Sequence, residues 1–471
     1  MAEPGGVIEL GSDFALIEWE RPPPPVWWRR GWALIGYAAI VLLLLGPGAP
    51  VGLGPVVPVG AIPAGGAIAY ELSADTLFAA WFAFRAPTFG AAETRASQAT
   101  LDAYRLSDGQ LRWRVLIPVD LGSLLIRTAG PDTVVVSSLD LGATGDRTVA
   151  YDAYSGRLLW DSRLPLLPAV EPAATVVLGA YLDGDGEPAG SPYVQTPGTG
   201  TVPAMLLQAV GVRTGAVAWS LRVPRGYATA LPVVPAYPGR SGAAYAVLIG
   251  PGGEARSVDL HRGTVTGTGR VRSGPTLLVS GHWLLSGYPD RGVNTLASYR
   301  ADTLAPAWTG TVRSLDLAVT ECGELTCLTD PEGTRAVDLA AGETRWTAPA
   351  WQPVAMLDGW VYAMPQQGRG GPDSLLSPAS GAPVLDLAGW SLIPGMAGSQ
   401  YLVSAGRPAD QLGSAPTAAW LGVLRASAAG LPRVVPVAPL SGSRVGGCTA
   451  AQPFVLCDAG DQRLWIWRLR A

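Results

Sequence analysis

The residue types that most often perform chemistry are scarce in this chain of 471 residues. Its only two histidines are His261 and His282, and it has no lysine, so all 33 basic residues are arginine. Lysine Schiff-base chemistry is therefore excluded, and the shortage of histidine argues against catalytic dyads and histidine metal sites. Amide ligands are equally scarce, because Asn294 is the single asparagine. We expect no catalytic residue, no cofactor-binding residue and no metal ligand.

Four cysteines form two closely spaced pairs. Cys322 and Cys327 lie five positions apart, and Cys448 and Cys457 lie nine positions apart. Pairing across one hairpin is the simplest interpretation of such spacings, although four cysteines allow three connectivities and four buried free thiols are the alternative. Zinc is disfavoured, because a C-x₄-C spacing without a nearby histidine is a poor ligand set.

Two further groups could in principle hold a ligand. Asp183-Gly-Asp-Gly-Glu187 places carboxylates at alternate positions, as part of a calcium loop does, but the rest of the twelve-residue pattern is absent, which favours a solvated acidic turn. Trp465 and Trp467 share one face of an expected strand and could line a planar slot, but aromatic residues at this spacing more often fill space between sheets. Both histidines are isolated, which favours surface or packing roles.

The segment 31–50 predicts a transmembrane helix. The run 31–46 contains no charge, and the uncharged continuation supplies the roughly 20 residues that span a bilayer. Arg29 and Arg30 precede it and no basic residue follows until Arg85, so the positive-inside rule places 1–30 in the cytoplasm as a tail and the rest outside. A cleaved signal peptide is the alternative. An uncleaved signal anchor is favoured, because the N-terminal flank is long and partly acidic and no clear cleavage site follows.

After about residue 66 the sequence repeats one phrase, a small polar turn ending in Gly with an aromatic residue four positions later. Gly occupies seven of eight turn positions and Trp five of eight aromatic positions, and adjacent turns lie 38 to 59 residues apart. The turn and aromatic positions are Gly109 and Trp113, Gly156 and Trp160, Gly215 and Trp219, Gly263 and Gly267, Leu304 and Trp308, Gly342 and Trp346, Gly381 and Leu385, and Gly430 and Val434.

The chemistry of the phrase predicts its structure. Gly supplies the positive φ of a tight hairpin, and the Ser, Thr or Asp before it can bond back to the turn backbone. The Trp then falls on the last strand of a sheet, where its ring can pack between neighbouring sheets. A spacing near 40 residues is that of a propeller blade with four strands. The abundance of Gly and Pro, 60 and 42 residues, also favours short strands and turns.

The phrase is similar to the D-x-x-T-G-x-x-x-W repeat of PQQ-like propellers, the quinoprotein alcohol dehydrogenase-like fold. The resemblance covers roughly residues 66–470 and implies an all-β propeller. Such propellers usually have eight blades, so we expect about eight, although a literal count along this chain gives nine units and one cycle near 230–300 would then be misassigned. The absence of lysine indicates GC-rich coding, which is typical of an actinobacterial source. The chain therefore resembles an actinobacterial, membrane-anchored type of this propeller.

These signals divide the chain into four parts. We expect a cytoplasmic tail at 1–30, a transmembrane signal anchor at 31–50, a linker at 51–65 and the propeller at 66–471. A strand within 51–62 would complete the last blade, so that both ends of the propeller meet in one sheet and no edge is left exposed. The protein is thus expected in the cell membrane as a single-pass protein with an extracytoplasmic propeller, where disulfides persist.

Three classes of function follow from the resemblance. The PQQ-dependent dehydrogenases that share the repeat hold a quinone and calcium, with a catalytic Asp, Glu and Asn ligands and often a disulfide between adjacent cysteines, and this chain has one Asn and no adjacent cysteines. The second class is a non-catalytic scaffold, as in envelope assembly factors that bind proteins at blade loops or edges. The third is a sensor with a rim pocket formed by the loops 84–97, 183–201 and 366–374.

We favour the scaffold, with a protein partner and no enzyme activity. Nucleic acid is not expected as a partner, because 15% of residues are charged, the net charge is −4 and no basic stripe is present.

Overall fold

Every element of the computed structural model is a β-strand in the part of the chain that it describes. That part is 54–470 without 64–66, 74, 83–97, 119–122, 140–145, 168–174, 184–185, 187, 191–201, 233–244, 367–369, 394–400, 405–418, 427–429, 441–445, 452 and 459–462. The predicted membrane segment 31–50 and the tail before it lie outside the described residues. Among the described residues there is no helix that is long and apolar enough to cross a membrane.

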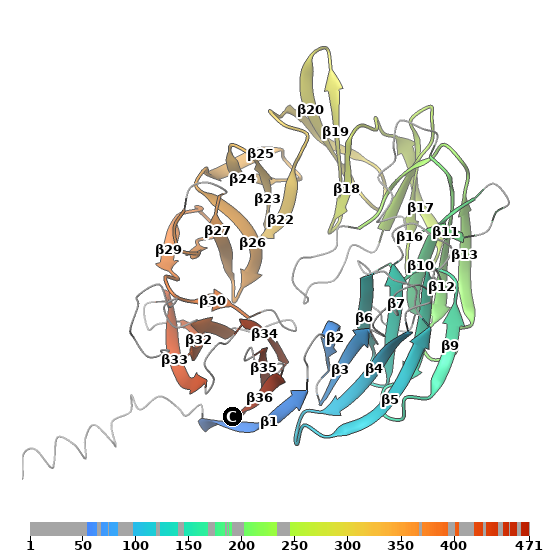
Figure 1. Ribbon diagram of the computed structural model, residues 1–471. Helices are drawn as coiled ribbons and strands as arrows, with labels where there is room; N and C mark the ends of the chain where they lie inside the picture. The colour runs from blue at the N-terminus through green and yellow to red at the C-terminus, as the bar shows by residue number, and fades with distance from the viewer. Residues whose placement is uncertain are drawn as a thin grey trace, which may run out of the picture. The chain divides into compact units, whose positions relative to one another are not determined.

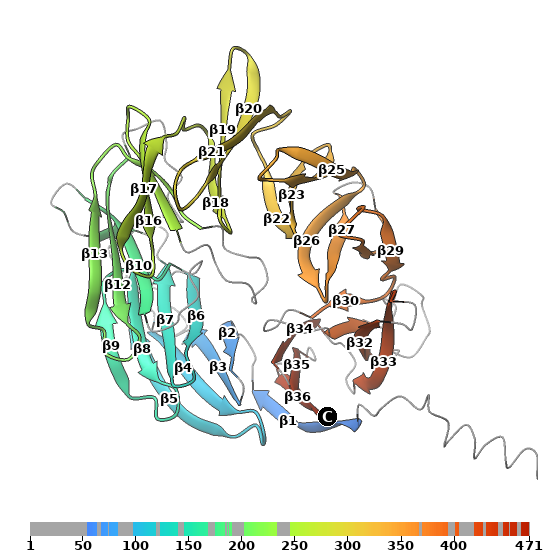
Figure 2. The ribbon, with the colours of Figure 1, turned by 180° about the vertical axis from the view of Figure 1, so that it is seen from behind.

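The described strands form nine antiparallel sheets of four strands each, which we number in chain order and write from the first to the fourth strand (Figures 1 and 2). Sheets 1 to 3 are β2 (Ala67–Leu72), β3 (Thr76–Phe82), β4 (Gln98–Arg105) and β5 (Leu111–Pro118); β6 (Ser123–Ala129), β7 (Thr133–Leu139), β8 (Arg147–Asp152) and β9 (Leu158–Ser162); and β11 (Pro188–Gly190), β10 (Thr175–Leu182), β12 (Ala204–Gly211) and β13 (Val217–Val223).

Sheets 4 to 6 follow the same plan. They are β14 (Ala228–Ala230), β15 (Tyr245–Ile249), β16 (Glu254–Asp259) and β17 (Thr264–Arg270); β18 (Thr276–Ser280), β19 (Trp283–Asp290), β20 (Val293–Arg300) and β21 (Pro306–Thr311); and β22 (Ala318–Cys322), β23 (Leu325–Asp330), β24 (Gly333–Asp338) and β25 (Glu343–Ala348).

Sheets 7 to 9 complete the series. They are β26 (Trp351–Leu357), β27 (Trp360–Pro365), β28 (Ser374–Leu376) and β29 (Pro383–Asp386); β30 (Ser391–Leu392), β31 (Tyr401–Ser404), β32 (Ala419–Ala426) and β33 (Pro432–Leu440); and β34 (Gly446–Ala451), β35 (Phe454–Asp458), β36 (Arg463–Arg470) and β1 (Gly54–Pro63).

The core lies between successive sheets. A buried cluster joins sheets 1 and 2, in which Phe78 and Leu101 meet Val134 and Val149, and similar clusters join each following pair up to sheets 7 and 8. β33 of sheet 8 contacts β1, and sheet 9 shares a cluster with sheet 1 around Ile62. This cyclic succession of four-stranded sheets, each packed on the next, is that of a β-propeller.

The closing strand lies where the sequence places it. β1 pairs antiparallel with β36 from Gly54 opposite Arg470 to Pro63 opposite Arg463, so the first and last described strands share sheet 9. In Figure 1 the blue β1 runs beside the red β36. The edge that β36 would otherwise leave open is therefore covered within the chain itself.

The number of sheets differs from the expected eight. The described residues contain nine, and the cycle near 230–300 is not misassigned, because sheets 4 and 5 both lie within 228–311 and each has four strands. The eight-blade expectation came from the resemblance, whereas the literal count of repeat units along the chain agrees with the structure.

Candidate interaction surface

The repeated turn has the backbone that its sequence predicts. Glycine at the seven turn positions has a φ between +65° and +75°, and at the eighth position Leu304 adopts a φ of +60°. The residue before the turn position bonds back to the residue after it in five copies. The acceptors are the side chains of Asp108, Ser155, Thr214, Thr303 and Ser380, at 3.0 to 3.4 Å from the backbone nitrogen.

The glycine has a second role that concerns the neighbouring sheet. A Cβ at Gly215 would lie 2.5 Å from the Trp160 side chain of the preceding copy, and the same contact recurs at 2.4 to 2.7 Å in four other copies. The five contacts are Trp113 on Gly156, Trp160 on Gly215, Trp219 on Gly263, Trp308 on Gly342 and Trp346 on Gly381. The repeat therefore predicts how neighbouring sheets pack: the Trp ring of one sheet covers the turn glycine of the next sheet. We call this the packing rule.

Hydrogen bonds fix the ring on its turn. Trp160 Nε1 donates to the carbonyl oxygen of Val212 at 2.7 Å, and Trp113, Trp308 and Trp346 donate to the corresponding carbonyls at 2.8 to 3.0 Å. Trp219 is the exception, since its buried Nε1 has no hydrogen-bond partner within the described structure. The indole thus contributes one directed bond as well as apolar area at four of the five contacts.

Sheets 4 and 5 meet by the reverse arrangement. The aromatic position of the fourth copy is Gly267, and a Cβ there would lie 2.6 Å from the Asp302 carbonyl oxygen and 2.7 Å from the Thr303 backbone. A Cβ at Gly269 would lie 3.2 Å from the Leu304 side chain, which is buried. Glycine and the large residue have exchanged sheets, so both sequence departures in copies four and five have one structural cause.

Both expected disulfides are present. Cys322 pairs with Cys327 and Cys448 with Cys457, each between the first and second strands of its sheet. This confirms the pairing across one hairpin that the spacings favoured, and no described cysteine is free. The loops that they close are short, so each disulfide stabilises the fold by an amount on the order of 2–3 kcal/mol.

The candidate chemical groups are not brought together. His261 and His282 are both exposed and lie on sheets 4 and 5, as expected of surface residues. The acidic turn from Asp183 lies only partly within the described residues, and those residues contain no group of three or more potential metal ligands. Trp465 and Trp467 stack on β36 with ring centroids 6.4 Å apart. Of the three loops expected to shape a rim pocket, 84–97 is outside the described residues and the other two are described in part.

One buried ionisable group has a clear structural explanation. Asp102 is 1% exposed and accepts hydrogen bonds from Tyr104 Oη at 2.8 Å and from two Arg114 nitrogens at 2.6 and 2.8 Å. Burial, and then the Asp102 charge, raise the pKa of Tyr104 to about 12. The hydrogen bonds among these three residues lie within sheet 1, so they join β4 to β5 and have a structural role.

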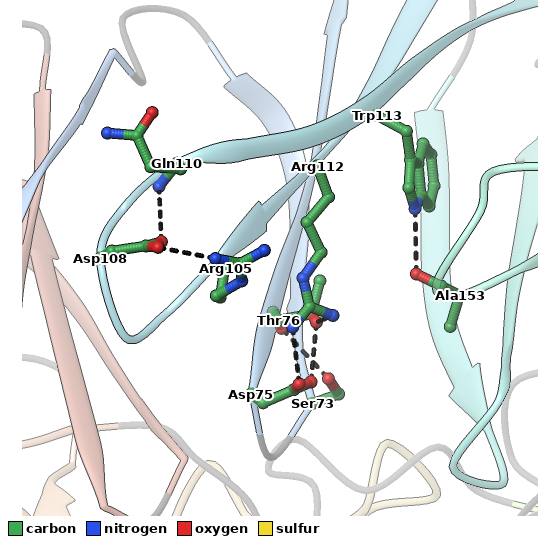
Figure 3. A network of polar contacts seen from close by, with 9 residues as sticks. All are labelled: Ser73, Asp75, Thr76, Arg105, Asp108, Gln110, Arg112, Trp113 and Ala153. Carbon is green, nitrogen blue, oxygen red and sulfur yellow. Dashed lines mark hydrogen bonds and ion pairs between the residues drawn. The ribbon is translucent and has the colours of Figure 1, made fainter.

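Polar contacts at the edge of sheet 1 are likewise internal (Figure 3). Arg112 on β5 donates to Asp75 and Thr76, both at 2.8 Å, and so joins the fourth strand to the turn between the first two. In the same view the Trp113 indole reaches across to the Ala153 carbonyl of sheet 2. Both arginines of β5, Arg112 and Arg114, are therefore engaged in hydrogen bonds within sheet 1.

A row of exposed apolar residues is a surface feature that packing within the fold does not explain. The second residue after the turn glycine is Leu111, Leu158, Val217 and Val265 in sheets 1 to 4, and these side chains are 45 to 55% exposed. The equivalent residues of sheets 5 to 8 are Pro306, Thr344, Pro383 and Pro432. We call the first four the apolar row. In sheets 1 to 3 the Trp two positions after the row residue packs on the turn glycine of the next sheet, so the row residues lie on consecutive sheets that pack on one another.

Sequence reasoning missed the apolar row, although its signal was present. Superposing the eight copies on their turn position puts an aliphatic residue at one place in the first four copies and proline or threonine there afterwards. Proline at an edge strand blocks pairing and an exposed aliphatic side chain favours contact, so the two halves of the repeat differ in what they can bind.

The fold and its repeat contacts define the protein as a β-propeller of nine described sheets. No family model and no curated protein matches the chain. Among solved structures it is similar to BamB from Moraxella catarrhalis, with 14% identity over 88% of this chain and 98% of that chain and a TM-score of 0.36.

Two further solved structures are similar over different shares of the chain. The C-terminal WD40 domain of Sif2 has 11% identity over 88% of this chain and 99% of its own, with a TM-score of 0.37. The quinohemoprotein alcohol dehydrogenase of Comamonas testosteroni has 13% identity over 62% of each chain and a TM-score of 0.36. At these scores the fold is assigned from the nine sheets themselves.

Proposed function

We propose that this chain is a non-catalytic, membrane-anchored propeller that serves outside the cytoplasm as a protein-interaction or assembly scaffold. The observation that carries the proposal is the apolar row. Its four aliphatic side chains recur at one repeat position on consecutive sheets and remain about half exposed. Exposed apolar residues that recur as a group, unlike single scattered ones, commonly mark a protein-binding site.

Membrane anchoring and location are supported by sequence. The uncharged run at 31–50 with Arg29 and Arg30 before it favours a span with its N-terminus in the cytoplasm. Two disulfides are typical of oxidising compartments outside the cytoplasm. Protease treatment of intact spheroplasts tests this topology. We expect degradation of the propeller, and protection of residues 60–471 would refute it.

The scaffold is tested by crosslinking and affinity purification of the full-length chain from membranes of its native host. The row variant carries Leu111→Ser, Leu158→Ser and Val217→Ser. A matched control carries Val293→Ser, Met364→Ser and Trp420→Ser, three side chains of 39 to 46% exposure outside the row. We expect the wild type and the control to recover the same partner protein and the row variant to lose it. Equal recovery by all three, or equal loss by both variants, would contradict the proposal.

The absence of catalysis is tested separately. The purified full-length chain should not bind the quinone PQQ or oxidise alcohols and sugars when PQQ and calcium are added. The sequence supports this expectation, because it has a single asparagine and no adjacent cysteines. Saturable one-to-one quinone binding in the micromolar range, about −8 kcal/mol, would overturn it.

A further inference from the structure

β17 is an edge strand with little protection, since its one charged residue, Arg270, is its last and a bulge interrupts its pairing with β16. Its sequence, Thr264-Val-Thr-Gly-Thr-Gly-Arg270, contains no proline and no charge before its last residue, and among the described strands it pairs with β16 alone. Proline, charge or short length normally prevents such an edge from pairing with another chain. The other fourth strands carry these devices, namely Arg112 and Arg114 in β5, Asp161 in β9, Arg222 in β13, Pro306 in β21, Arg345 in β25, Pro383 in β29, Pro432 and Pro436 in β33 and Pro58 in β1.

The side chains of β17 before Arg270 are small, and one of them is tied to sheet 5, where Thr266 Oγ1 donates to the Asp302 carbonyl oxygen at 2.8 Å. Thr264, Val265, Thr266 and Thr268 are exposed and small, and threonine and valine favour extended backbone. Gly267 and Gly269 face sheet 5, where they contact the turn at Asp302–Leu304. The strand is seven residues long, has a bulge at Thr266 and pairs with no described strand on its outer side, so its backbone groups on either side of the bulge can pair with an added strand.

Two arginines beside this edge lack a counter-ion. Arg256 lies opposite Thr268, and Arg270 follows Thr268 by two residues, so both guanidinium groups extend from the same face of the sheet. Neither makes an ion pair within the described structure, and both are exposed. An incoming strand with carboxylates at alternate positions would place them along this face.

The acidic residues near the edge are already engaged. Glu254 lies opposite Arg270, but its carboxylate accepts a hydrogen bond from Tyr227 Oη at 3.3 Å. Asp259 accepts from the backbone nitrogens of His261 and Arg262, at 2.8 and 3.2 Å. Beyond the strand, the guanidinium of Arg272 is paired with Asp290 at 3.1 Å. Arg262 also pairs with Asp259, at 3.6 Å, so Arg256 and Arg270 stand against the single charge of Glu254 and the net charge beside the edge is positive.

We propose that β17 accepts an extended acidic segment of a partner protein as a fifth strand of sheet 4. The segment's backbone pairs with β17 and its alternate carboxylates face Arg256 and Arg270. This inference rests on the proposed scaffold function and specifies the chemistry of one partner segment. Val265 belongs to both β17 and the apolar row, so the edge continues the surface on which that function rests.

The test uses the purified full-length chain in detergent micelles and a fluorescent ten-residue peptide of alternating glutamate and valine. Two comparison peptides replace every glutamate by lysine or every valine by proline, which removes either the charge match or the backbone donors. The charge variant is Arg256→Glu with Arg270→Glu. The matched control is Arg425→Glu with Arg433→Glu, two exposed arginines that lie directly opposite each other on the third and fourth strands of sheet 8.

We expect the glutamate peptide to bind at least tenfold more tightly than either comparison peptide. The charge variant should weaken its binding at least tenfold and the control should not, while hydrogen exchange of the 264–270 amides slows only in the complex. Equal binding of the glutamate and lysine peptides, equal binding by the charge variant and the wild type, or unchanged exchange at 264–270 would overturn the proposal. The row variant retains Val265, Arg256 and Arg270, so a failure here is distinguishable from a failure of the scaffold test.

Discussion

Replacing Trp160 by alanine tests the packing rule of the repeat. The ring is 8% exposed, covers Gly215 of the next sheet and donates to the Val212 carbonyl at 2.7 Å. An indole buries roughly 150–250 Å², which at about 25 cal/mol per Å² corresponds to roughly 4–6 kcal/mol as an upper bound. Measured costs of buried Trp→Ala changes are about 3–5 kcal/mol, and the unpaired carbonyl adds about 1 kcal/mol. We expect Trp160→Ala to lower the free energy of unfolding by about 4 kcal/mol.

His261→Ala is the matched control, on sheet 4. Its side chain is exposed, and the hydrogen bond that it makes to Asp259 comes from the backbone nitrogen, which alanine retains. The expected change is within about 0.5 kcal/mol. Denaturant unfolding of the two variants is compared by far-UV circular dichroism. This signal reports the backbone, so removing one of the 17 tryptophans leaves it comparable between variants. Equal shifts of the unfolding midpoint would refute the assignment of Trp160 to the contact between sheets 2 and 3.

Three further predictions follow from particular contacts. Trp160→Phe should cost about 1–2 kcal/mol more than Trp219→Phe in the same assay, because the Trp219 Nε1 has no hydrogen-bond partner to lose in the described structure. Leu304→Gly should lower the free energy of unfolding by about 1–3 kcal/mol, since relief of its left-handed backbone returns about 1–2 kcal/mol but the lost buried side chain costs about 2–5 kcal/mol; a more stable variant would contradict this balance. Burial raises the pKa of Glu71 above its ordinary 4.5, with Arg127 opposing the shift, so the folded state holds this proton more tightly and stability is lost as the pH rises through the folded-state pKa. Glu71→Gln should flatten that loss in unfolding midpoints measured across the acidic range, and an unchanged pH profile would exclude Glu71 as its source.

The repeat was predictable because each copy restates the same local chemistry. A turn glycine, a polar residue before it and a ring after it determine a hairpin whose backbone the structure reproduces, with Leu304 as the one non-glycine turn residue. The closing strand followed from the need to complete the last blade, and the disulfides from the close spacing within each cysteine pair. The turn glycine and the ring recur along the sequence because most sheets need the same φ angle at the turn and the same contact with the next sheet.

The count of sheets and the candidate surface required the structure. The fourth copy looks decayed in sequence because Gly267 stands where tryptophan is expected, yet β14–β17 form a complete sheet. The apolar row was missed for a different reason. Leu111 and Val265 are about half exposed and are not needed for the contact between sheets, so a single copy of the repeat does not reveal them.

The departure at sheet 4 links packing to the proposed binding edge. Tryptophan at position 267 would collide with the backbone of Asp302 and Thr303, so the close approach of sheets 4 and 5 requires glycine there. The same requirement removes the large ring that the fourth strand carries in sheets 1 to 3. What remains is a strand of threonine, valine and glycine that ends in Arg270 and lies beside Arg256 of β16. An edge of this composition is a liability unless a partner covers it, since bare pairing groups recruit other strands. The positive charge beside the edge restricts which strands can pair there, because acidic segments are attracted and a second basic edge is repelled. The local change in packing between sheets 4 and 5 therefore accounts both for the interrupted repeat and for the weak protection of the edge at which we propose that a partner segment pairs.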